Sequence, residues 1–221
     1  MTSPRQIIRL RVLAAFLAGI ASGLSITVAM VATAPNPAIK TQSTANQGTA
    51  TVEDAPAQNV PIYMQTDERW GGLPYANATL ADSGCGLTCA AMAWSYFSGE
   101  DWTPIDMLNA VGNDYVQDGQ NYMPGFCAWM HERDAAITSS VIYEDMARAI
   151  EDLEAESLVF AEMQGQLEGG GQSYGGHIVL LTEYDGQSVT IHDPCSPYAV
   201  ILTYEQMAGV DWGYFISIGR S

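Results

Sequence analysis

The chain has few positive charges. Eight Lys and Arg residues stand against 25 Asp and Glu residues among 221, which gives a formal net charge of −17 at pH 7. Nucleic acids and anionic membrane surfaces attract proteins through positive charge, so neither is expected as the main partner of the folded part. The excess of acidic side chains is interpreted as a solvated surface that keeps the protein soluble.

Metal-binding residues are also scarce. The chain has four Cys and three His residues, and their spacing suggests neither a zinc site nor another metal centre. We therefore expect no metal and no cofactor. Internal repeats and a second domain are absent too, and 221 residues suffice for one domain with a packed core. The sequence does not decide which of Cys89, Cys127 and Cys195 pair in disulfides.

The N-terminus contains the longest uncharged run. Arg5, Arg9 and Arg11 precede residues 12–34, which carry no charge. Residues 1–34 are therefore interpreted as a signal peptide or an N-terminal membrane anchor that places the following chain outside the cytoplasm. A small-residue cleavage site ends at Ala34, but the length of the run favours a retained anchor. Residues 35–59, rich in Pro, Ala, Thr, Asn and Gln, are expected to form a disordered linker.

The remaining chain, 60–221, changes in pattern from helix to strand. After a short extended piece at 60–65, helices are predicted at 85–97, 104–112, 124–134 and 143–156. Strands are predicted at 158–163, 178–184, 188–192, 199–203 and 213–218, with a flexible loop at 169–176 and a short helix at 204–208. Helices followed by antiparallel strands predict an α+β domain.

The most informative stretch is residues 82–94, a Gly-rich turn that leads directly into an apolar helix. Cys85 lies in the first turn of this helix, where free N–H groups and the helix dipole favour a thiolate, the nucleophilic form of cysteine. Gly84 and Gly86 are expected to leave room for a substrate backbone. A buried, inert Cys85 is the alternative interpretation.

A partner for this thiol is expected in the strands. His177 begins one apolar strand, and Asp193 follows the next, before Pro194. The turn signal Asp185-Gly186 between the strands predicts a hairpin that makes His177 and Asp193 neighbours. Cys, His and Asp brought together in this way form a nucleophilic triad. His192 is expected to face away from Asp193, because neighbours on a strand point in opposite directions.

Four pieces of the sequence together resemble the C39-like cysteine peptidase family, which has the papain-like fold. They are residues 60–70, Ser83-Gly84-Cys85-Gly86, residues 176–182 and Asp193-Pro194. The resemblance implies that a nucleophile helix packs on a C-terminal antiparallel sheet. It also implies Cys85 as nucleophile, His177 as base, Asp193 as its orienting partner and Gln65 as a hydrogen-bond donor to the oxyanion.

Two positions depart from the family pattern. Leu87 replaces a common Pro, and Glu183 replaces a common Gly. The sequence also contains no ATP-binding module and no multi-span membrane domain, so we do not expect the transporter-fused form.

Three functions agree with these features. The first is an exported cysteine peptidase that acts on a peptide or protein substrate. The second is a cell-wall peptide amidase or acyl transferase with the same triad, which the sequence cannot separate from the first. The third is a non-catalytic surface binding domain, against which the complete triad argues. The sequence does not indicate an oligomeric state.

Overall fold

The computed structural model describes residues 59–167 and 172–221. The predicted signal peptide or anchor at 1–34 and nearly all of the predicted linker lie outside these residues. Within the described part of the chain, no helix combines the length and apolar character needed to cross a bilayer.

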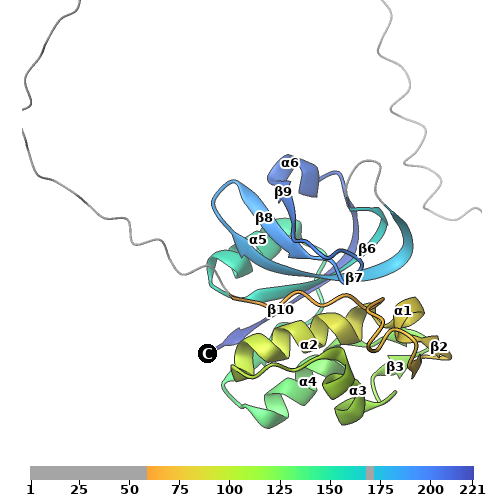
Figure 1. The fold of residues 1–221 in the computed structure, drawn as a ribbon. Coiled ribbons are helices and arrows are strands. Elements are labelled where there is room, and N and C mark those ends of the chain that lie inside the picture. Colours follow the sequence, from red (N-terminus) through yellow and green to blue (C-terminus); the bar gives the residue numbers. More distant parts are fainter. Residues whose placement is uncertain (1–58, 168–171) are drawn as a thin grey trace, which may run out of the picture. The chain divides into compact units, whose positions relative to one another are not determined.

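Helices dominate the first half of the described chain, and strands dominate the second half (Figure 1). The helices are α1 (Leu80–Ser83), α2 (Cys85–Ser98), α3 (Pro104–Val111), α4 (Met123–Arg133), α5 (Met146–Glu154) and α6 (Tyr204–Met207). This order confirms the predicted α+β class.

The main sheet has six strands, and every neighbouring pair is antiparallel. Its order is β5-β10-β6-β7-β8-β9. The strands are β5 (Ile137–Ser139), β6 (Leu158–Gln166), β7 (Ser173–Tyr184), β8 (Ser188–His192), β9 (Val200–Thr203) and β10 (Asp211–Arg220). Two small hairpins join the helical half: β1 (Pro74–Tyr75) with β2 (Ala78–Thr79), and β3 (Val116–Gln117) with β4 (Gln120–Asn121).

The sheet separates two apolar cores. Successive residues of a strand point to opposite faces, and β6 illustrates the rule. Leu158 and Phe160 pack against the helical half, whereas Val159 and Ala161 pack in the core that contains the buried side of α5. Figure 1 shows α2, α3 and α4 together on one side of the sheet and α5 on the other. The sheet therefore presents one face to the helix that carries Cys85.

Helix α2 lies in the centre of the larger core. Its residues are buried on nearly every side, as expected for an apolar helix without a polar face. The helix ends where Gly99 adopts the left-handed conformation (φ 70°), which glycine adopts with little strain. Helix α3 begins with a capping box between Thr103 and Asp106, with Pro104 in its first turn. Both predicted helices are confirmed.

Three predicted segments differ in the structure. The helix expected from 143 begins at Met146 with Asp145 as its N-cap, while Tyr143 forms a β-bridge with Phe215. The residues at 60–65 form no strand. Ser173–Gly176, expected in a flexible loop, belong to β7, because Ser173 and Tyr174 pair with the end of β6. His177 therefore lies within a strand instead of at its mouth.

Candidate active site

Cys85 is the first residue of α2, as predicted, and its side chain is partly exposed. The short helix α1 and Gly84 lead into it. The first N–H groups of a helix have no intrahelical partner, and the helix dipole is positive at this end. The sulfur of Cys85 therefore lies at the electropositive end of a helix that is fixed in the core.

The two glycines beside Cys85 are required by packing within the protein. A Cβ atom at Gly84 would lie 2.5 Å from the backbone oxygen of Leu80, and one at Gly86 would lie 2.5 Å from Cβ of Asn121. Both distances are shorter than side-chain packing allows. These glycines let α1 and the β4 strand approach the start of α2, and the expectation that they also make room for a substrate backbone stays a prediction.

His177 and Asp193 are neighbours, as the hairpin predicted. Nε2 of His177 lies 2.7 Å from Oδ1 of Asp193, and the two residues are only 4% and 5% exposed. The backbone N–H of Asp185 donates to the backbone oxygen of Ser188, and its side-chain Oδ1 accepts from the backbone N–H of Ser188, which closes the hairpin turn. His192 is also buried, and its Nδ1 lies 3.3 Å from the backbone oxygen of Pro61. This contact agrees with the prediction that His192 is a structural residue.

His177 and Asp193 form an imidazolium–carboxylate ion pair. Burial lowers the pKa of His177, but hydrogen bonds to Asp193 and Cys85 outweigh burial and raise the pKa to about 9. Burial alone would raise the pKa of Asp193, but its hydrogen bond to His177 and the charge of the imidazolium lower it. The imidazolium form is therefore favoured at neutral pH. Because Nε2 faces Asp193, Nδ1 is the nitrogen left for Cys85.

Tyr174 holds the imidazole from one side. Its ring stacks on His177 with centroids 3.9 Å apart and planes 9° from parallel, and its hydroxyl donates to Oδ2 of Asp193 at 3.1 Å. Tyr174 lies in the segment that was predicted as a loop, so its role was missed. Alternation along an extended strand places residues 174 and 177 on opposite faces, and the bulge in the β6–β7 pairing brings them together.

Asn121 is a second residue that sequence reasoning missed. Its Nδ2 donates to the backbone oxygen of Ser83 at 2.9 Å and lies 3.5 Å from Sγ of Cys85. The hydroxyl of Tyr75 donates to its Oδ1 at 2.8 Å, which fixes the amide in this orientation. An amide donor aimed at the sulfur stabilises a thiolate. No local pattern marks Asn121, since it lies in a two-residue strand distant from Cys85 in the sequence.

Gln65 is buried beside the start of the nucleophile helix. Its Nε2 donates to the backbone oxygen of Ala81 in α1 at 2.7 Å, and its backbone N–H donates to Pro194 at 2.7 Å. The predicted donor therefore connects α1 with the segment that carries Asp193. One of its two amide hydrogens remains for another acceptor.

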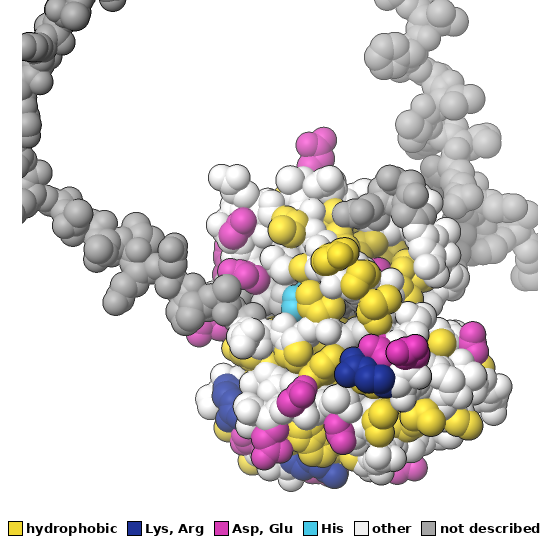
Figure 2. All heavy atoms as spheres, viewed as in Figure 1, with side chains coloured by type: hydrophobic (Ala, Val, Ile, Leu, Met, Phe, Trp, Pro, Cys, Tyr) yellow, Lys and Arg dark blue, Asp and Glu magenta, His cyan; other side chains and the backbone are white. Residues whose placement is uncertain are grey.

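A cleft of about 490 Å³ opens between the helical half and the sheet, where Cys85 and His177 meet. Cys85 and Asn121 line it from the helical half, and Glu162, His177 and Tyr214 line it from the sheet. Figure 2 shows Asp and Glu side chains spread over one face of the molecule, with Lys and Arg at only a few places.

The other three cysteines differ from Cys85, and all four are free. Cys89 and Cys127 are buried, and burial raises the pKa of both thiols, that of Cys127 to about 12. Cys195 is half-buried, and burial raises its pKa to about 11. Its sulfur lies within 4.8 Å of ligand atoms of His177 and Asp193, a grouping that could hold a metal and that sequence spacing did not suggest. However, those two residues already bind each other through Nε2 and Oδ1.

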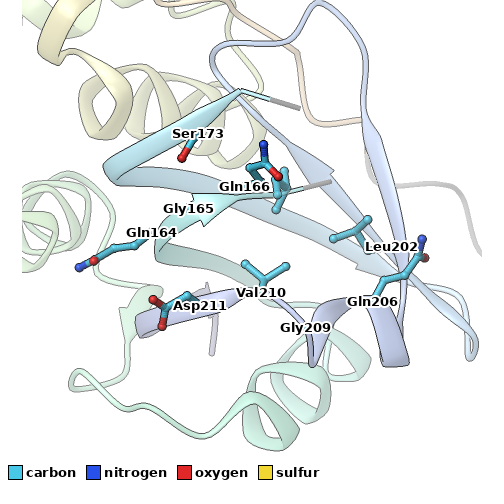
Figure 3. Close-up of a pocket in the computed structure, with 10 residues that line it drawn as sticks. Gln164, Gly165, Gln166, Ser173, Leu202, Gln206, Gly209, Val210 and Asp211 are labelled. Carbon is cyan, nitrogen blue, oxygen red and sulfur yellow. The ribbon is translucent and has the colours of Figure 1, made fainter. Parts of the chain in front are cut away.

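A larger hollow of about 840 Å³ lies beyond the cleft (Figure 3). Gln164 of β6 lines both, so the two cavities meet at this side chain. Figure 3 shows Gln164 and Asp211 at one end of the hollow and Leu202 and Gln206 at the other.

The chain matches a protein-family model over most of its length and is similar to several solved structures. Residues 57–215 match the model of the Peptidase_C39 like family. A solved structure described as a C39-like peptidase from Bacillus anthracis is 18% identical, with 74% of this chain and 96% of that chain covered and a TM-score of 0.48. A double glycine motif protease from an AMS/PCAT transporter, in complex with its leader peptide, is 16% identical, with 76% and 96% covered and a TM-score of 0.44.

No curated protein matches the chain. The family model nevertheless covers well over half of it, including the whole of the cleft. The chain therefore belongs to the Peptidase_C39 like family and is a cysteine peptidase.

Proposed function

We propose that this cysteine peptidase is exported and cleaves peptide bonds with Cys85 as nucleophile, His177 as general acid and base, and Asp193 as the orienting partner. The observation that carries the proposal is the position of His177, which hydrogen-bonds Asp193 through Nε2 and also interacts with Cys85. This is the order of groups that activates a nucleophile through a base held by a third residue.

In the first half of the reaction, Sγ of Cys85 attacks the peptide carbonyl carbon, and the carbonyl electron pair moves to oxygen. The oxyanion then re-forms the carbonyl as the C–N bond breaks, and protonated His177 donates its proton to the leaving amine, which leaves the acyl group on Cys85 as a thioester. In the second half, His177 takes a proton from water, and the hydroxyl attacks the thioester carbon. The resulting tetrahedral intermediate collapses with cleavage of the C–S bond, so the acid product leaves and the bonding electron pair returns to sulfur as a thiolate beside the imidazolium.

The oxyanion requires donors that are in place before the reaction. The backbone N–H of Cys85, at the first position of α2, is one candidate. The Gln65 amide is the other, since Ala81 accepts only one of its two hydrogens. Asn121 contributes differently, because its Nδ2 faces the sulfur and stabilises the thiolate before attack.

The proposal of export comes from the N-terminal sequence. Three arginines precede the uncharged run at 12–34, an arrangement that keeps the first residues in the cytoplasm and moves the following chain outward. The peptidase would then work at the outer surface of the membrane, on peptides or proteins that reach it there.

Selective alkylation tests the nucleophile. The purified protein is treated briefly with iodoacetamide at neutral pH, and the modified residue is identified by peptide mass mapping. Cys89, Cys127 and Cys195 have raised pKa values and should stay protonated, so Cys85 should react first. Cys85→Ser should lose both labelling and peptide hydrolysis, whereas Cys89→Ser should keep most of each. Normal turnover by Cys85→Ser would rule out the proposed nucleophile.

Substrates distinguish a peptidase from an amidase or a transferase. Quenched fluorescent peptides and soluble peptidoglycan fragments are tested side by side, with and without added amine acceptors. Cleavage of linear peptides supports the proposal. Turnover of peptidoglycan fragments alone, or transfer to the amine, would instead support the alternative chemistry on the same residues.

A further inference from the structure

We propose that the cleft selects peptides with a positively charged side chain, and that the carboxylate of Glu162 binds that charge. This inference rests on the proposed function of the same cleft and names the class of substrate that fits it. Three observations on this carboxylate support the inference. It faces the cleft, glycines on the neighbouring strands leave space for it, and no described residue forms a hydrogen bond or ion pair with it.

Glu162 lies on the face of the sheet that is turned toward the helical half. It pairs with Ile178 of β7 on one side and with Tyr214 of β10 on the other, and all three line the cleft. The alternation of β6 places it on the same face as Phe160, two residues earlier, which packs in the core beneath α2. At Glu162, the apolar core ends and the sheet lines the cleft.

The neighbouring strand leaves space for the carboxylate. Gly213 follows Trp212 in β10, where the register with β6 shifts. Any Cβ atom at this position would overlap Oε2 of Glu162, and a Cβ atom at Gly176 would lie 3.6 Å from Oε1. A side chain at position 213 would therefore occupy the place that the Glu162 carboxylate now takes.

Within the described parts of the chain, the Glu162 carboxylate forms no hydrogen bond and no ion pair. The side chain is half-buried. Burial, together with the nearby charge of Asp211, raises its pKa. A carboxylate that is partly removed from water without a partner is unfavourable, and a cation placed against it would relieve this cost.

The surroundings of Glu162 also favour a cation. Asp82 lines the opposite wall of the cleft, and Asp211 lies where the larger hollow begins (Figure 3). Among the described residues, no Lys or Arg lines either cavity. The imidazolium of His177 also lines the cleft, but it is paired with Asp193, so the unpaired charges there are negative. A low-dielectric cleft with an excess of one sign of charge concentrates ligands of the other sign. A Lys or Arg side chain of the peptide supplies that charge at the end of a flexible apolar stem.

The test compares peptides that differ only in one side chain. A peptide that the wild-type protein cleaves is made with Lys, norleucine or Glu at each position near the cleavage site. At one position, we expect kcat/KM for Lys to exceed that for norleucine by about tenfold or more, with Glu the poorest. Equal rates for Lys and norleucine at every position would overturn the proposal.

Variants assign the preference to Glu162. In Glu162→Gln, which keeps the shape and removes the charge, the Lys-to-norleucine ratio should approach one. Glu162→Lys should reverse the order of Lys and Glu. Asp82→Asn, on the opposite wall, should lower the ratio less than Glu162→Gln does, because the Asp82 carboxylate already accepts a hydrogen bond from the hydroxyl of Thr79. Loss of the preference for Lys in Asp82→Asn but not in Glu162→Gln would show that Asp82 binds the cationic side chain, and it would overturn the inference.

A binding measurement separates this inference from the proposed function. Fluorescein-labelled Lys and norleucine peptides are titrated with Cys85→Ser protein, and affinity is read by anisotropy. Tighter binding of the Lys peptide, lost in Cys85→Ser/Glu162→Gln, supports the subsite even if no peptide is hydrolysed. Hydrolysis without any charge preference in binding or turnover supports the peptidase and overturns the subsite. Thermal unfolding checks that each variant is folded.

Discussion

The negative charge of Asp193 controls the protonation of His177. The pKa of His177 is raised from 6.5 to about 9, because hydrogen bonds to Asp193 and Cys85 outweigh the effect of burial. A group with a raised pKa contributes its stabilisation fully below its unfolded value and loses it as the pH rises through the folded value. The imidazolium–carboxylate pair therefore persists at neutral pH, while its contribution to stability is full below pH 6.5, declines above that value and is lost as the pH passes about 9.

This titration predicts the alkaline limit of activity. We expect kcat/KM of the wild-type protein to fall above about pH 9 as His177 loses its proton. Asp193→Asn keeps a hydrogen-bonding group but removes the charge, so the limit should move to lower pH and kcat should fall strongly. Steady-state kinetics across pH measure both. An unchanged alkaline limit in Asp193→Asn would show that its charge does not set the pKa of His177.

The positions of Cys85, His177 and Asp193 could be derived from sequence because each lies beside a local signal. A Gly-rich turn precedes Cys85, and the Asp185-Gly186 turn fixes the strands that carry His177 and Asp193. Asn121 and Glu162 have no such signal. Asn121 reaches the sulfur only through tertiary packing of a two-residue strand, and Glu162 is one acidic residue among many until the sheet is assembled.

At the scale of elements, the start of α2 depends on close contact with β4. Gly86 lies against Asn121 and Met123, and a Cβ atom there would be 2.5 Å from Cβ of Asn121 and 2.7 Å from Sδ of Met123. We expect Gly86→Ala to lower the free energy of unfolding by about 1–3 kcal/mol, the usual cost of overpacking. It should also slow alkylation of Cys85, because the Asn121 amide is displaced from the sulfur.

Gly72→Ala is the matched control, since a Cβ atom there meets no heavy atom within 4 Å and its φ is not in the left-handed region. Its effect should stay within about 0.5 kcal/mol. Urea unfolding of both variants, with iodoacetamide labelling rates, makes the comparison. If Gly86→Ala is as stable and as reactive as the control, the close packing at α2 has no role in positioning the thiol.

Long elements with clear periodicity or turn residues were predicted well. Helix α3 and strand β8 agree with their expected ranges, because a capping box and a hairpin turn define them. Short elements were missed, including β5 and both small hairpins, since two or three residues carry no period. The start of β7 was missed for another reason: Gly175 and Gly176 are typical of loops, but pairing with β6 holds this segment extended.

At the scale of the whole molecule, the two halves of the described chain meet at the cleft. The helical half supplies the sulfur, and the sheet supplies the imidazole, so neither half holds the site alone. Buried segments from both halves tie them together: Cys89 of α2 donates to Ile178 of β7, and Gln65 donates to Pro194. The class of fold followed from the order of helices and strands, but the cleft itself depends on side-chain packing that sequence order does not define.

The N-terminal sequence determines where this folded part is expected in the cell. Residues 12–34 carry no charge and follow three arginines, so we expect residues 60–221 to lie outside the cytoplasmic membrane. Protease added to intact cells should then remove the peptidase domain, detected by antibody, while a cytoplasmic marker protein stays intact. Protection of the domain until the cells are lysed would contradict export.

N-terminal sequencing of the mature protein distinguishes the two forms of export. A retained anchor leaves the original N-terminus and keeps the protein in the membrane fraction after washing with high salt. Cleavage after Ala34 instead gives a protein that begins at Pro35 and is released from the membrane. We expect the retained form, because the uncharged run is long enough to span a bilayer and because proline directly after the cleavage site fixes the backbone and removes an N–H group.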